Sequence, residues 1–335
     1  MQLEPLIELT RGGMAECLHF GAVAVVNTKG ELVAHVGNPH MVTFTRSTLK
    51  ALQALPFVQA KGPQHFGFSK PQIALLCASH NGEPMHVMQA QGMLDKIDLD
   101  YTALRCGCHV PSLFAALDQG PPADLKFDER HNNCSGKHTG FLAHCVLHGM
   151  RLDDYIDPMH PLQQAIRTEV ARAVGMDAQD MPMGIDGCSA PNYAMPLSKL
   201  AYGYARLASG AQDAEFGESF ALLSDAMTGH PEMVSGTARN DLDFMTVGRG
   251  DWVTKVGADG VQVVGSKSRG EAFAIKILDG NKPALFAAAV EVLDQLGWMD
   301  DAQRTALQPW RAQTLRNARQ VHVGDRLPVF KLQTA

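Results

Sequence analysis

The first residues that could carry chemistry are Ser47 and Lys50, which stand three positions apart in the stretch Arg46-Ser47-Thr48-Leu49-Lys50. At the start of a predicted helix, this spacing places the lysine one turn after the serine and on the same face. A serine hydroxyl is a weak nucleophile until a base takes its proton, and a neutral lysine can be that base. A serine that merely caps a helix, followed by a solvated lysine, gives the same pattern.

A second polar cluster, Ala78-Ser79-His80-Asn81-Gly82-Glu83, follows the apolar residues 73–77. We expect the apolar run to be buried. The serine, histidine and asparagine after it should therefore emerge at an edge of the core, where binding sites tend to lie. An ordinary polar turn would look the same in the sequence.

A third stretch, Lys255-Val256-Gly257, lies in a predicted hairpin. A glycine beside a strand lysine lets a substrate backbone or carboxylate approach closely. In this chain order, S-x-x-K, S-x-N and K-x-G are the three elements of serine β-lactamases and penicillin-binding proteins. The three motifs together favour acyl-serine chemistry, although the gap between Ser79 and Lys255 is long and holds features that those enzymes lack.

The most specific signal lies in that gap, in the run His131-Asn132-Asn133-Cys134-Ser135-Gly136-Lys137-His138 and the loop Gly184-Ile185-Asp186-Gly187-Cys188. Cysteines in polar loops, among histidine and aspartate, are candidate ligands for a soft metal. Cys134 and Lys137 fall on one face of a predicted helix, so both could point at Cys188. The alternative is a pair of free, buried thiols.

The elements that must position these residues are strands at both ends of the chain and helices between them. Residues 6–9, 22–26 and 32–36 predict an antiparallel meander, and 252–257, 261–264 and 272–277 predict later strands. Apolar residues between Leu49 and Val58 recur at roughly helical spacing, and Pro56 limits how far that helix runs. Further helices are predicted over 161–174 and 284–296. An edge strand is predicted at 329–332, beginning after Pro328.

These elements predict an α+β fold, an antiparallel sheet flanked by helices with a helical insertion lobe. We expect one two-lobed catalytic domain over residues 1–335, β-rich at 1–45 and 245–335 and mainly helical over 46–244.

The composition excludes several classes of protein. The 335 residues are 45% hydrophobic and 19% charged, which is typical of a globular chain and not of a disordered one. A net charge of -6 argues against nucleic-acid or anionic membrane partners. No apolar run reaches the roughly 18 residues that a membrane helix needs. Seven cysteines without framework spacing, and an N-terminus without the features of a signal peptide, predict a cytoplasmic protein.

The quoted motifs together resemble the Rhizobium-type L-asparaginases, the thermolabile class 3 amidohydrolases, over nearly the whole chain. The Cys-Ser-Gly-Lys-His run and the Asp-Gly-Cys loop are the most specific parts of the resemblance, which extends to Lys255-Val256-Gly257-Ala258-Asp259-Gly260. It implies a fold like that of serine β-lactamases and glutaminases, a homodimer, and hydrolysis of the small-molecule substrate L-asparagine to L-aspartate and ammonia.

The resemblance also implies the residues of the site. Ser47 would pair with Lys50 and Ser79 with Lys255, as the catalytic residues. One zinc ion per chain, not essential for activity, would be held by Cys134, Lys137 and Cys188. The substrate would contact Arg46, Asp186 and His138. The resemblance gives no role to residues 235–251.

Such a site would work through an acyl-enzyme, because an amide needs an activated nucleophile and a proton donor for the departing ammonia. Either serine could be the nucleophile; we favour Ser47, whose lysine lies on the same helix. The alternatives are hydrolysis of another small amide such as L-glutamine, a zinc-bound water attacking from the Cys134 and Cys188 site, a penicillin-recognising acyl-serine protein, and an amino-acid sensor without catalysis.

Overall fold

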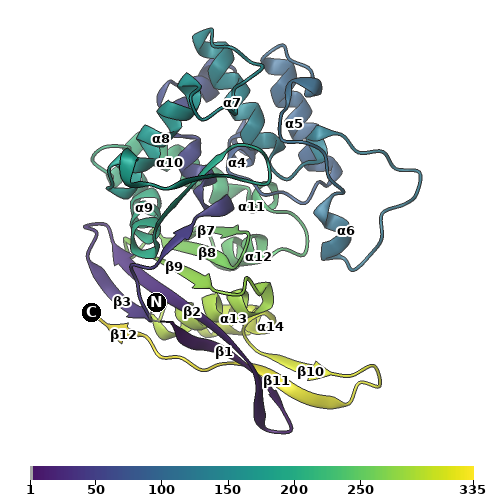
Figure 1. The fold of residues 1–335 in the computed structure, drawn as a ribbon, viewed down its shortest axis with the longest axis vertical. Coiled ribbons are helices and arrows are strands. Elements are labelled where there is room, and N and C mark those ends of the chain that lie inside the picture. Colours follow the sequence, from purple (N-terminus) through teal and green to yellow (C-terminus); the bar gives the residue numbers. More distant parts are fainter. Residues whose placement is uncertain (1–2) are drawn as a thin grey trace. The chain divides into compact units, whose positions relative to one another are not determined.

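The computed structural model describes residues 3–335 and has an α+β architecture with a large antiparallel sheet (Figure 1). This confirms the predicted fold class. Met1 and Gln2, which open the N-terminal segment used to predict the location, lie outside the described residues. The chain divides into two compact units: unit 1 runs to Thr48 and takes in Met195–Ala208 and Val247–Ala335, and unit 2 comprises Leu49–Ala194 and Ser209–Thr246. The single two-lobed domain and its insertion lobe stay predictions.

Unit 1 is built on the antiparallel sheet, whose main path is β10-β11-β1-β2-β9-β8-β7. Strand β3 pairs with β2, and β12 pairs with β3. The consecutive antiparallel strands β1, β2 and β3 form the predicted meander (Figure 1). The strands are β1 (Glu4–Arg11), β2 (Met14–Asn27), β3 (Leu32–Val36), β7 (Trp252–Gly257), β8 (Val261–Ser266), β9 (Glu271–Ile277), β10 (Gln313–Arg316), β11 (His322–Pro328) and β12 (Gln333–Thr334).

Helices cover both faces of this sheet. Helix α13 (Lys282–Gln295), capped by the Asn281 side chain, packs on β9, β1 and β11, and α14 (Asp301–Arg311) packs on α13. The Phe273 ring of β9 meets Trp298, just beyond α13. On β8, Val264 pairs with Phe273, and Gly265 is the next residue along the strand. Gly265 approaches helix α9 (Leu197–Ser209): a Cβ on Gly265 would lie 2.7 Å from Tyr204 O. Since strand residues alternate between faces, α9 lies opposite α13.

The C-terminal strand differs from its prediction. Strand β11 ends at Pro328, whereas the sequence predicted a strand over 329–332 with Pro328 before it. Proline has no N–H to continue a strand ladder, so it can close a strand as well as begin one. Beyond it, Val329 N donates one hydrogen bond to Leu6 O. Strand β10 and helix α14 were not predicted at all.

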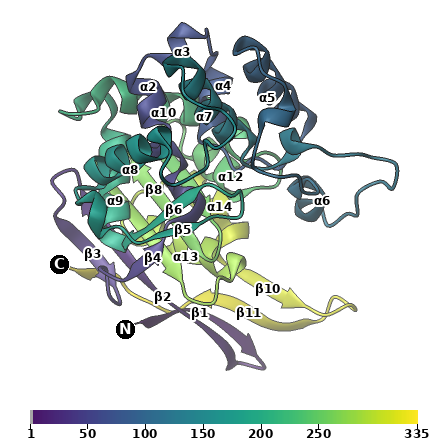
Figure 2. The same cartoon turned by 45° about the horizontal axis from the view of Figure 1, so that its top comes forward.

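Unit 2 is mainly helical, and α7 packs there against α2, α4, α5 and α8 (Figure 2). Its β-structure includes the antiparallel pair β5 (Met183–Ile185) and β6 (Pro191–Pro196). Its helices are α1 (Lys50–Gln53), α2 (Leu55–Gln59), α3 (Gly62–His65), α4 (Lys70–Leu76), α5 (Pro84–Lys96), α6 (Ser112–Ala116), α7 (Ser135–His148), α8 (Pro161–Val174), α10 (Gly217–Gly229), α11 (Pro231–Val234) and α12 (Asn240–Val247). Among the described residues, no helix is long and apolar enough to span a bilayer.

Two glycines bring α7 close to α4, and this contact positions the candidate site. A Cβ on Gly136 would lie 2.4 Å from Leu75 O, and one on Gly140 would lie 2.5 Å from Leu76 Cδ2. Only glycine leaves room for this approach. As a result the N-terminus of α7, with Cys134 and Lys137, lies beside the segment that follows α4 and carries Ser79.

Candidate functional site

Lys50 and Ser79 are in contact within unit 2. Lys50 is the first residue of α1, only 1% exposed, and its Nζ lies 3.0 Å from Ser79 Oγ. The same Nζ donates to Ala78 O at 2.5 Å and to Asn133 O at 3.3 Å. The apolar residues of α4 are buried as predicted, and Ser79 follows them in a buried position. The lysine therefore joins the end of α4, the start of α7 and the Ser79 hydroxyl.

His80 fixes the backbone beside Ser79. Its Nδ1 accepts a hydrogen bond from Gly82 N, so its Nε2 carries the proton and donates to Ser135 Oγ at 2.9 Å. Burial lowers the pKa of His80 well below its usual value, and the nearby His86 and Lys50 lower it further. The ring is neutral and stacks on His86, with centroids 4.8 Å apart. On the other side, Ser79 N donates to Val234 O.

Cys134, Lys137 and Cys188 meet in a buried cluster, as their sequence spacing predicts. Lys137 Nζ lies 3.1 Å from Cys188 Sγ, and Cys134 Sγ donates to Asn133 Oδ1 at 3.3 Å. His138 is next to them: its Nδ1 bonds Tyr155 Oη at 2.7 Å, and burial lowers its pKa while the neighbouring Cys188 partly opposes this. The cluster thus brings together two sulfurs and two side-chain nitrogens.

The charges of this cluster depend on one another. The interaction with Cys134 and the charge of Lys137 lower the pKa of Cys188 despite its burial. The interaction with Cys188, together with burial, raises the pKa of Cys134 well above its usual value. Burial alone would lower the pKa of Lys137, but the charge on Cys188 outweighs burial and raises the pKa. Lys137 and Cys188 therefore favour each other's charged form.

The loop between β5 and β6 turns Cys188 inward. Asp186 Oδ1 accepts a hydrogen bond from Gly187 N, and Asp186 O accepts one from Ser189 N. Ser189 has a left-handed φ of 68°. Asp186 is half-buried, and its charge helps to raise the pKa of Lys137. The predicted neighbours Asp186 and Lys137 are thus electrostatically linked.

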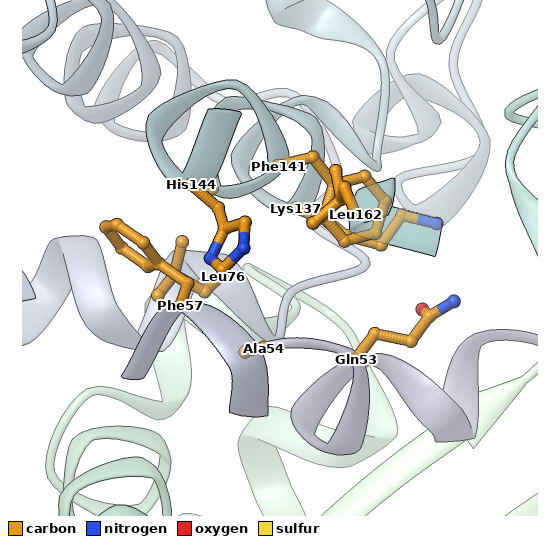
Figure 3. Close-up of a pocket in the computed structure, with 9 residues that line it drawn as sticks. Gln53, Ala54, Phe57, Leu76, Lys137, Phe141, His144 and Leu162 are labelled. Carbon is orange, nitrogen blue, oxygen red and sulfur yellow. The ribbon is translucent and has the colours of Figure 1, made fainter. Parts of the chain in front are cut away.

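A small cavity lies between α7 and the helices α1, α2 and α4 (Figure 3). Its volume is about 10 Å³, which is close to the space that one water molecule needs. Lys137, Phe141 and His144 line it from α7, opposite Gln53, Ala54 and Phe57. The Lys137 stem is therefore held against apolar walls, with its amine 5.4 Å from the Phe141 ring centroid.

Ser47 and Lys255 both belong to unit 1. Lys255 is fully buried on β7, where its Nζ donates to Val256 O at 2.8 Å, and Ser47 is half-buried in the 3-10 turn η1 (Arg46–Leu49). Gly257 lets these segments meet, because a Cβ there would lie 3.0 Å from Thr45 O. Arg46, expected to contact substrate, forms an ion pair with Asp259 at the β7–β8 turn.

Sequence reasoning therefore finds most of the clustered side chains but not their partners. The structure places Lys50 on Ser79 in unit 2; the predicted pairing of Ser47 with Lys50 and of Ser79 with Lys255 stays a prediction. The backbone carbonyls of Ala78 and Asn133 carry no side-chain signal, so no pattern could reveal them. The histidine at position 80 was visible, but its bond to Ser135 depends on the packing of α4 against α7.

The protein is an amide hydrolase, since residues 7–327 match the family model described as L-asparaginase II. That match spans nearly the entire sequence, and the chain belongs to this family, which confirms the resemblance drawn from the motifs. No curated protein matches the chain closely enough to count as a relative.

Proposed function

We propose that this protein hydrolyses L-asparagine to L-aspartate and ammonia through an acyl-enzyme formed on a serine. The observation that carries the proposal is the buried contact of Lys50 Nζ with Ser79 Oγ at 3.0 Å. The family supports an asparaginase activity, and this contact supplies a base within reach of a nucleophile.

Two backbone carbonyls orient the Lys50 amine for this role. A neutral amine has two N–H groups and one lone pair. Lys50 Nζ donates to Ala78 O, to Asn133 O and to Ser79 Oγ. When Lys50 acts as a base, the two carbonyls can still accept its N–H groups while its lone pair faces the Ser79 hydroxyl. This arrangement favours Ser79 as the nucleophile with Lys50 as its base. It differs from the pairing with Ser47 that the sequence favoured.

The reaction then has two steps. Ser79 Oγ attacks the carboxamide carbon as Lys50 takes the hydroxyl proton, and that proton passes to the leaving nitrogen, so that ammonia departs and an ester remains. Water then attacks the ester, gives a proton to Lys50, and releases aspartate as the serine regains its proton. We propose in addition that Ser47 and Lys255 take part in catalysis and that Arg46, Asp186 and His138 contact the substrate.

We propose further that Cys134, Lys137 and Cys188 hold one zinc ion. No group of three or more His, Cys, Asp or Glu side chains among residues 3–335 is arranged to hold a metal. The proposed set, however, has only two such residues. The two sulfurs match ligands that zinc accepts. Lys137, 3.1 Å from Cys188 Sγ, could join them only after losing its proton, because an ammonium has no lone pair, so zinc binding should weaken as the pH falls. A bound zinc would supply positive charge near the substrate, while the serine carries the reaction.

The covalent intermediate distinguishes the candidate nucleophiles. Wild-type enzyme quenched in acid during turnover of L-asparagine, and then digested, should carry the aspartyl adduct on the peptide with Ser79, as mass spectrometry would detect. An adduct on the Ser47 peptide would contradict our choice of nucleophile. Turnover without an adduct, abolished by a chelator and restored by zinc, would favour attack by a metal-bound water instead.

The remaining proposals concern the substrate and the setting. L-Glutamine is the second candidate substrate, because it carries the same carboxamide one methylene further away. We also propose a homodimer that acts in the cytoplasm, where cysteine thiols stay reduced. Light scattering on the purified protein should give twice the 36.2 kDa of the chain; a mass of one chain would contradict the dimer.

A further inference from the structure

The segment between α11 and α12, to which the resemblance assigns no role, is hydrogen-bonded to the Ser79 segment within unit 2. Ser79 N donates to Val234 O at 2.9 Å, and Asn81 Nδ2 donates to Thr237 O at 3.0 Å. The Glu83 carboxylate accepts hydrogen bonds from both Thr237 N and Thr237 Oγ1. The two segments therefore hold a fixed position relative to each other.

Gly236 explains why this contact is so close. It has a φ of 97°, and a Cβ there would lie 2.4 Å from Asn81 Oδ1 and 2.5 Å from Glu83 Oε1. A side chain at this position would push the two segments apart. The close contact fixes the backbone from which Arg239 projects.

Arg239, on the same segment, has a positive charge that no ion pair within residues 3–335 neutralises. Its side chain is partly buried, and its one hydrogen bond is a long one of 3.4 Å, from Nη1 to Ser112 Oγ. Burial lowers the pKa of Arg239, an effect that Asp241 only partly opposes. A guanidinium has several N–H donors, so most of its hydrogen-bonding capacity is left for a ligand.

Within residues 3–335, Asp241 is the carboxylate whose charge acts on this guanidinium. The Glu83 carboxylate is engaged by Thr237, and His80 is neutral. Arg239 and Lys50 both lie near enough to the His80 ring to act on it. His80 directly follows Ser79 in the chain. The Arg239 guanidinium and the Lys50–Ser79 pair therefore both lie near residues 79–80.

We infer that Arg239 binds the α-carboxylate of the amino-acid substrate and so selects amides that carry a free carboxylate. This inference rests on the proposed function. Arginine presents parallel N–H donors that match both oxygens of a carboxylate. The carboxylate would neutralise the buried charge, and the carboxamide of the same small molecule would lie toward Ser79.

The test compares the turnover of two substrates by wild type and by two variants of Arg239. L-Asparagine is compared with 3-aminopropanamide, which has the same amide and amine but lacks the carboxylate. Arg239→Gln should lower kcat/KM for L-asparagine about 100-fold, mostly through KM, because a buried charged pair is lost. It should change kcat/KM for 3-aminopropanamide less than about twofold. Arg239→Lys should recover part of the loss, because it restores the charge without the paired donors.

A binding measurement separates this inference from the proposed reaction. Calorimetry should show that wild-type protein binds L-aspartate and that Arg239→Gln binds it at least about 30-fold more weakly. The exposed Arg151→Gln, on the same unit, is the matched control and should bind like wild type. Equal losses on both substrates, unchanged L-aspartate binding in Arg239→Gln, or no binding by wild type would overturn the inference. If L-aspartate binds through Arg239 but the protein releases no ammonia, the proposed hydrolysis is contradicted and the carboxylate site is supported.

Discussion

Lys50 Nζ donates hydrogen bonds to three oxygens, and two of them are backbone carbonyls that have no proton to give. The third, Ser79 Oγ at 3.0 Å, belongs to a hydroxyl and is therefore the group from which Lys50 could take a proton. The identity of these two side chains could be predicted from the sequence, because serine and lysine occur in recognisable motifs. Their pairing could not, since it depends on Ala78 O and Asn133 O, which any residue type would provide.

The buried cluster of Cys134, Lys137 and Cys188 leads to a prediction about zinc content. Cys188→Ala should reduce bound zinc from about one ion per chain to nearly none, because it removes the thiolate that contacts Lys137. Elemental analysis of protein dialysed against zinc measures this directly.

The matched control is Cys145→Ala, which alters a buried free cysteine further along the same helix. Burial raises the pKa of that thiol to about 12, so it is protonated and not a ready metal ligand. Zinc content that stays at one ion per chain in Cys188→Ala would show that the proposed ligand set is wrong.

Among the elements, α7 carries most of the site, and its position depends on glycines. Gly136 and Gly140 allow it to approach α4, so that Cys134 and Lys137 come beside the Ser79 segment. The sequence predicted that a helix begins in the run of residues 131–138, and it predicted α8 at its observed bounds. The helix-to-helix approach was not predictable, because a glycine in a helix can equally mark a flexible point.

The same helix carries a prediction about stability and pH. Burial, with His148 and His160 nearby, lowers the pKa of His144 to about 4. A histidine whose pKa is lowered by folding stabilises the native state above its unfolded pKa near 6.5, and this contribution is lost as the pH falls toward 4. Between pH 7 and pH 5 the expected loss is about 2 kcal/mol.

Urea unfolding at these two values of pH tests the effect. His144→Leu, whose side chain cannot titrate, should lose less stability than wild type on acidification. The exposed His65→Gln should behave like wild type and serves as the control. If wild type and His144→Leu lose the same free energy of unfolding, His144 does not account for the acid sensitivity of α7.

The strands at the two ends of the chain show where sequence patterns succeed and fail. The hairpin of β7 and β8 was predicted, because the Ala258-Asp259-Gly260 turn separates two apolar runs. Strands β10 and β11 were not, since their burial is irregular and their residues are largely polar. The pairing of β11 with β1 is a long-range contact, and no local pattern encodes it.

For the whole molecule, the sequence predicted an α+β fold and an amide hydrolase, and both are confirmed. The division into two units was harder to predict. Helix α9 lies within the region predicted to be helical, over 46–244, yet most of it belongs to unit 1 with the sheet. Most residues of α9 are buried, and a local sequence pattern does not show which part of the chain buries them.

The most direct test of the account is ammonia release from L-asparagine by the purified full-length protein and by Ser79→Ala. Wild type should release one ammonia for each L-aspartate formed, and Ser79→Ala should lose at least about 1000-fold in kcat, since removal of a nucleophile has effects of this size or larger. Both proteins should have the same circular dichroism spectrum. A folded wild type that releases no ammonia, or a Ser79→Ala variant that keeps the wild-type rate, would contradict the central claim.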